Sequence, residues 1–80
     1  MYVVIFAQVV KGQPFTTINV GNVFDCGDDF DLAVQRAIEL VLAQSETSGL
    51  SRSVLQTTIE ENQCFEGVGW TVTISMTEDG

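Results

Sequence analysis

The stretch Asp28-Asp-Phe-Asp-Leu-Ala-Val-Gln-Arg-Ala-Ile-Glu-Leu-Val-Leu-Ala-Gln44 decides the fold, because it has the pattern of an amphipathic helix. Asp28 is the predicted N-cap, and Asp29 and Asp31 place negative charge in the first turn, where the helix dipole favours it. Leu32 and Leu42 lie outside the apolar stripe, so we expect them to form an apolar interface with another helix or another molecule. The stripe itself should face a sheet and consists of Phe30, Ala33, Val34, Ala37, Ile38 and Val41.

Two predicted strands precede this helix. The segment from Tyr2 to Val10 is rich in β-branched and aromatic residues, and both of its alternating faces are apolar, which is typical of a central strand. Lys11-Gly-Gln-Pro14 has the composition of a turn. The segment from Phe15 to Val20 or beyond is therefore the predicted returning strand of a hairpin.

A further strand is predicted near the end of the chain. Four apolar residues alternate with hydroxyl residues and predict a half-buried strand, with Trp70 in the core: Trp70, Val72, Ile74 and Met76. The glycine-rich segment 65–69 before it is a predicted loop, and Glu78-Asp79-Gly80 a short acidic tail. Segment 51–62 favours a helix with Ser51 as its N-cap, whereas Thr57-Thr58 within it prefers a strand.

These elements place the chain in the α+β class. The predicted order is β-β-α-α-β, or β-β-α-β-β if 51–62 is a strand. Either order gives two layers, an antiparallel sheet with helices on one face. A chain of 80 residues has the length of one small domain, so we predict a single compact α+β domain over residues 1–80.

The charge balance restricts the partners. Eleven acidic residues face three basic ones, and the formal net charge is −8 at pH 7. Such a surface repels nucleic acids and anionic lipids, so we expect neither direct nucleic-acid binding nor membrane binding. The expected partner is a basic protein surface. Because the chain has no long apolar span and its first ten residues lack the features of a signal peptide, we expect a cytoplasmic protein.

Few residues have the chemistry that catalysis needs. The sequence has no histidine, which excludes a Ser-His-Asp triad. Cys26 and Cys64 form no C-x-x-C motif, and two cysteines favour reduced thiols over a disulfide framework. The carboxylates of segment 25–31 do not match the spacing of a Ca²⁺-binding loop. We therefore expect no catalytic residue, no metal site and no cofactor.

Binding through carboxylates is the function class that remains. A patterned negative face accelerates and selects binding to Lys/Arg clusters on a partner. The predicted partner-binding residues are Asp28, Asp29, Asp31, Glu60, Glu61 and Glu66.

In its size, its charge and its compact α+β plan without histidine, the chain resembles the small acidic inhibitors that phages direct against host defence, including anti-CRISPR proteins. This resemblance implies a non-enzymatic inhibitor that occupies a basic nucleic-acid-binding surface of a bacterial protein. The alternative is a structural or assembly subunit that forms a homodimer, since one helical layer leaves a sheet face open. The hairpin before a helix with Ala33, Ala37 and Ala43 is also loosely similar to antitoxin domains of the HicB type.

Overall fold

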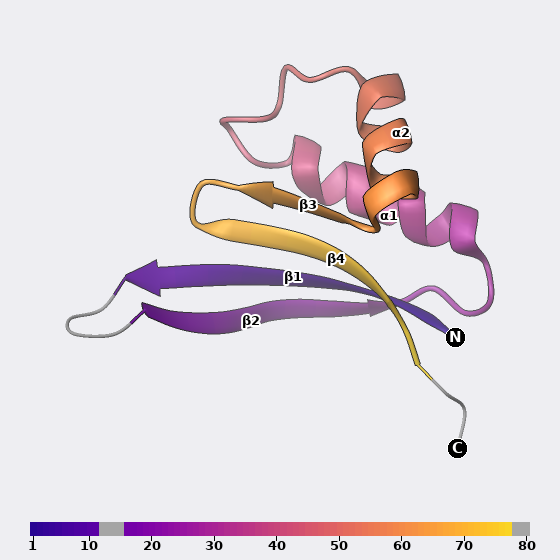
Figure 1. Ribbon diagram of the computed structural model, residues 1–80, viewed down its shortest axis with the longest axis horizontal. Coiled ribbons are helices and arrows are strands. Elements are labelled where there is room, and N and C mark those ends of the chain that lie inside the picture. The colour runs from indigo at the N-terminus through magenta and orange to yellow at the C-terminus, as the bar shows by residue number, and fades with distance from the viewer. Residues whose placement is uncertain (12–15, 78–80) are drawn as a thin grey trace.

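In chain order, the helix predicted at the middle of the sequence follows a strand hairpin and precedes a second helix (Figure 1). The computed structural model describes the backbone of residues 1–11 and 16–77 and the side chains of residues 1–8 and 21–77. Within these residues the order of elements is β1 (Tyr2–Lys11), β2 (Thr16–Asp25), α1 (Phe30–Leu42), α2 (Arg52–Asn62), β3 (Cys64–Gly67) and β4 (Trp70–Met76). The predicted turn at 11–14, apart from Lys11, and the tail at 78–80 lie outside the described residues.

The strands form one antiparallel sheet in the order β2-β1-β4-β3. The strand β1 is central, as its two apolar faces predict, and pairs with β2 on one side and β4 on the other. The α+β class with an antiparallel sheet is confirmed. Segment 51–62 is a helix, so the alternative order with a strand there is wrong; Ser51 stands at its N-cap position in an extended conformation.

Both helices pack on the same face of the sheet. In β1 and β4 the buried residues of this face alternate with residues of the other face, as the period of a strand requires. The resulting core contains Val4 and Phe6 of β1, Trp70, Val72 and Ile74 of β4, Leu55 and Ile59 of α2, and the predicted stripe residues Ala33, Val34, Ala37, Ile38 and Val41 of α1. Phe30 of the predicted stripe is only half-buried and packs against this core.

The segment predicted as a loop at 65–69 is mostly a strand. The short strand β3 pairs with β4, and only Val68 and Gly69 connect them. Gly69 adopts a positive φ of 80°, which glycine tolerates without strain. A side chain at Gly67 would overlap the indole of Trp70, so glycine is required there for the close approach of the ring. Gly67 and Gly69, whose presence in the sequence indicates a loop, therefore permit the tight turn and close packing of the β3–β4 hairpin.

The hairpin of β1 and β2 extends beyond the rest of the sheet, away from the helices (Figure 1). The strand β4 pairs with Tyr2 to Gln8 of β1, and the remaining part of β1 pairs only with β2. The register shifts between Phe6 and Ala7, where Gly21 is the extra residue of a β-bulge. A Cβ atom at Gly21 would lie 3.2 Å from Cδ1 of Phe6, which explains a small residue at this bulge.

Candidate partner-binding surface

The first group of predicted site residues surrounds the start of α1. We call Asp28, Asp29 and Asp31 the α1 acidic cluster; all three are exposed. The N-cap is Asp29 and not Asp28 as predicted, because its Oδ1 accepts a hydrogen bond from the Leu32 N–H at 3.2 Å. Gly27, at a φ of 61°, turns the chain before the helix. Asp28 instead lies 3.4 Å from the terminal ammonium group of Met1.

The second group lies at the end of α2. We call Glu60 and Glu61 the α2 acidic pair; both side chains are exposed in the last turn of the helix. Two negative charges at a helix C-terminus are unfavourable, because the helix dipole is negative there. The helix ends at Gln63, which adopts the left-handed conformation with a φ of 57° and donates its N–H to Ile59. This end of the helix therefore carries an electrostatic cost.

The sheet brings these two groups toward one end of the molecule. Gly27, beside the α1 acidic cluster, accepts a hydrogen bond from the Tyr2 N–H at 2.6 Å. Gln63, after the α2 acidic pair, accepts a hydrogen bond from the Ile74 N–H at 2.8 Å. Ile74 pairs with Val4 of β1, and Val4 lies two residues after Tyr2. Both acidic groups therefore flank the end of the sheet at which β1 begins.

Glu66 does not belong to this arrangement. It lies on β3 and pairs with Thr71, which in turn pairs with Ala7, farther along β1 than Tyr2 or Val4. Its side chain is exposed. Of the six predicted partner-binding carboxylates, three thus lie at the start of α1 and two at the end of α2. Glu66 lies on the sheet, where its neighbour Phe65 packs against the core and Glu66 faces the opposite side.

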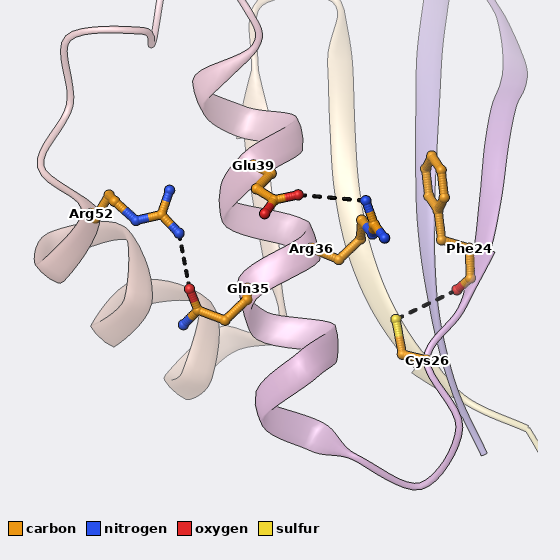
Figure 2. Close-up of polar contacts among 6 residues, drawn as sticks. All are labelled: Phe24, Cys26, Gln35, Arg36, Glu39 and Arg52. Atoms are coloured by element: carbon orange, nitrogen blue, oxygen red, sulfur yellow. Dashed lines mark hydrogen bonds and ion pairs between the residues drawn. The ribbon is translucent and has the colours of Figure 1, made fainter.

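Basic side chains neutralise little of the acidic surface. Arg36 lies between Glu39, at 3.5 Å, and the ring of Phe24, whose centroid is 5.4 Å from the guanidinium carbon (Figure 2). Arg52 donates a hydrogen bond of 2.9 Å to Gln35 and so connects the two helices (Figure 2). Among the side chains that the structure describes, the following carboxylates have no ion-pair partner: Asp25, Asp29, Asp31, Glu46, Glu60, Glu61 and Glu66.

Glu46 has a structural role that the sequence does not indicate. Its Oε1 accepts a hydrogen bond from the indole N–H of Trp70 and another, of 3.2 Å, from the Val68 N–H. The carboxylate thus fixes the loop between the helices to the β3–β4 turn. The contact spans more than twenty residues, so no local sequence signal predicts it.

The two leucines of the predicted apolar interface differ in their surroundings. Leu32 is 49% exposed, so it is available for contact. Leu42 is half-buried and packs against the core of this chain, so most of its surface already has a partner. The structure therefore leaves Leu32 as the exposed member of the pair.

The cysteines are free thiols. Cys26 is buried, and its thiol lies 3.8 Å from the carbonyl oxygen of Phe24 (Figure 2). Burial raises the pKa of the Cys26 thiol; the nearby Arg36 opposes this rise, and Asp25 and Asp29 add to it. Cys64 is half-buried on β3. The pKa of Cys26 is thus shifted in the direction opposite to that of a reactive thiolate.

The described residues contain no pocket and no group of three or more potential metal ligands. Neither described helix has the length and apolar character that a membrane span requires. Comparisons with protein-family models, with curated proteins and with solved structures find no match to this chain. The features on which a function can be argued are therefore the charged surface and the sheet.

Proposed function

We propose that this chain is a non-enzymatic acidic binding protein that occupies a basic, nucleic-acid-binding surface of a target protein. The observation that carries the proposal is the set of exposed carboxylates in the α1 acidic cluster and the α2 acidic pair. Among the described residues only Asp28 of this set has an ion-pair partner, the terminal ammonium group of Met1. Asp31 and the α2 acidic pair lie on helices and Asp29 is the N-cap of α1, so the backbone that carries them needs little ordering on binding. An inhibitor of bacterial defence of the anti-CRISPR type, encoded by a phage and acting in the host cytoplasm, fits this description.

The mechanism is competition. Lys and Arg side chains that normally contact phosphates pair instead with carboxylates held on the surface of the inhibitor, and the nucleic acid loses its site. Long-range attraction between opposite charges accelerates the encounter, and this attraction weakens as salt screens it. Binding should therefore be tight at low salt and weak at high salt.

The experiment is capture of proteins from a bacterial lysate on the immobilised chain, at low and at high NaCl concentration. We expect a nucleic-acid-binding protein that is released by salt and displaced by added DNA or RNA. A captured protein that neither salt nor nucleic acid displaces would contradict the proposal.

Charge reversal then locates the surface. Asp29 is unsuitable for reversal because it caps α1, so the first variant is Asp28→Lys/Asp31→Lys and the second Glu60→Lys/Glu61→Lys. Glu66→Lys is the control, since Glu66 lies apart from both groups. We expect at least one double variant to lose most of the binding, while the control changes it little. Equal binding by all three variants would show that these carboxylates do not form the site.

One observation favours the alternative of a homodimeric assembly subunit, namely the exposure of Leu32. If Leu32 forms the contact, Leu32→Glu should convert a dimer to a monomer in sedimentation velocity. A monomer in the unmodified protein at every concentration would exclude this alternative.

A further inference from the structure

The two edges of the sheet differ in how they are protected. The edge strand β3 has four residues, carries Glu66 and is accompanied by α2. The other edge strand, β2, has ten residues and lies on the side of the sheet away from the helices (Figure 1). Natural proteins commonly protect an edge by shortness, by charge, by proline or by a covering element. The strand β2 is long and has no charged residue from Thr16 to Phe24; its protective features are the bulge at Gly21 and the single charge of Asp25 at its end.

The charge distribution shows which occupant this edge can accept. From Thr16 to Phe24, β2 contains no charged residue, and its single charge is Asp25 at the end. Val23 is 57% exposed on this strand. A chain of net charge −8 can approach another copy of itself only where carboxylates are few. The strand β2 is such a place.

We propose that a second copy of this chain pairs its β2 with β2 antiparallel, around a two-fold axis, and so continues the sheet across both subunits. Full overlap of the ten residues places Thr16 of one copy opposite Asp25 of the other. Lys11 of β1 pairs with Thr16, so Lys11 belongs to the same row across the strands as the partner copy's Asp25. The two-fold axis produces this row twice, with opposite charges at both ends of the contact.

This register also keeps the faces of the two sheets continuous. It sets Ile18 opposite the partner copy's Val23. Within one copy Ile18 pairs with Val9 and Val23 pairs with Ile5. Val9 and Ile5 are four residues apart on β1 and so lie on the same face of the sheet. A shift by one residue would place opposite faces side by side. A shift by two residues would shorten the overlap and move Lys11 out of the row that contains the partner copy's Asp25. Self-complementarity of this kind is what distinguishes a second copy from an unrelated strand.

Sedimentation velocity of the full chain tests the inference, over concentrations from about 5 to about 500 µM, because dimer formation follows mass action. We expect the mass to rise toward twice 8.7 kDa. Val23→Glu should abolish the rise, since it places two new carboxylates in the contact. Val54→Glu is the matched control: Val54 is an exposed valine of α2, 62% exposed, and its replacement adds the same charge away from β2.

A charge exchange tests the register. Asp25→Lys alone and Lys11→Asp alone should each weaken the dimer several-fold, and the double variant should restore it. Added NaCl should strengthen the dimer, because it screens the repulsion between two anionic chains, whereas it weakens binding to a basic target. The inference is thus independent of the proposed function, and each can fail alone.

Three results would overturn the inference. The first is a monomer at every concentration, which would leave the β2 edge to a strand from another protein or to solvent. The second is a dimer that Val23→Glu leaves intact. The third is a dimer that Leu32→Glu abolishes while Val23→Glu does not, which would place the contact on α1.

Discussion

Trp70 shows how a single side chain organises one end of the core. Its ring stacks between Phe6 and Phe65, with centroid distances of 6.1 and 5.9 Å, and its N–H is bonded to Glu46. The side chain is 5% exposed. Backbone at Gly67 forms part of the surface on which the indole lies. This cluster joins β1, β3, β4 and the loop between the helices.

Replacement of Gly67 by alanine tests this packing. The added methyl group would overlap the indole of Trp70, so Gly67→Ala should lower the free energy of unfolding by about 1–3 kcal/mol, the range for overpacked sites. Gly49→Ala is the matched control, because a Cβ atom at Gly49 meets open space. We expect the control to change stability by less than about 0.5 kcal/mol. Urea denaturation followed by tryptophan fluorescence measures both, and equal effects would show that the close approach is unimportant.

Cys26 provides a prediction about pH. Burial raises the pKa of its thiol above the ordinary value of 9.0, so the unfolded chain loses this proton at a lower pH than the folded chain. Proton binding is then greater in the folded state, and stability should fall as the pH rises above about 9.0 toward the pKa of the folded state. Cys26→Ser should reduce this decline relative to the unmodified protein in urea denaturation at pH 7 to 10. The same decline in both proteins would assign it to other groups.

At the scale of elements, α1 depends on its first turn. Asp29 accepts the Leu32 N–H, whereas the neighbouring Asp28 makes only an exposed ion pair. Sequence preference alone does not separate two adjacent aspartates, because both are good N-caps. The backbone decides between them: Asp29 is extended, with φ −98° and ψ 102°, directly before the first helical residue.

The two aspartates should therefore differ when replaced. Asp29→Ala should lower the free energy of unfolding by about 1 kcal/mol, the usual cost of losing an N-cap. Asp28→Ala should leave it nearly unchanged, because its side chain is 91% exposed and its ion pair is screened by water. Thermal unfolding followed by circular dichroism at 222 nm compares them. A larger loss for Asp28→Ala would place the cap one residue earlier.

At the scale of the whole molecule, the surplus of carboxylates has an energetic cost. With a net charge of −8, folding brings like charges together, and their repulsion destabilises the compact state. Two ion pairs among the described side chains, both at exposed positions, offset little of it.

Salt should therefore stabilise the folded chain. Raising NaCl from about 0.01 to about 0.5 M shortens the range of electrostatic repulsion several-fold, so the midpoint of thermal unfolding should rise at pH 7. Near the isoelectric point of about 4.1 the net charge is small, and the rise should nearly vanish. Differential scanning calorimetry of dilute protein measures both conditions. An equal rise at both pH values would assign it to a general salt effect and not to repulsion.

Sequence patterns predicted the class of the fold, the central position of β1, the core stripe of α1 apart from the half-buried Phe30, and the buried face of β4 from Trp70 to Ile74. These follow from hydrophobic periodicity, which is a local property of the chain. Met76, predicted on that face, is 68% exposed because it stands at the last position of the strand. The sequence also determined the negative surface, because charge depends on composition alone.

Contacts between distant parts of the chain determine which residues with similar local patterns meet. The tertiary structure formed β3 from a glycine-rich segment, because pairing with β4 and contact with Trp70 outweigh the weak local preference. It placed the α1 acidic cluster and the α2 acidic pair beside helices and Glu66 on the sheet face away from Phe65 and the core, because the strand pairing and its alternation decide which side each residue faces. It also made β2 an edge, a property that belongs to the sheet as a whole and that no single segment encodes.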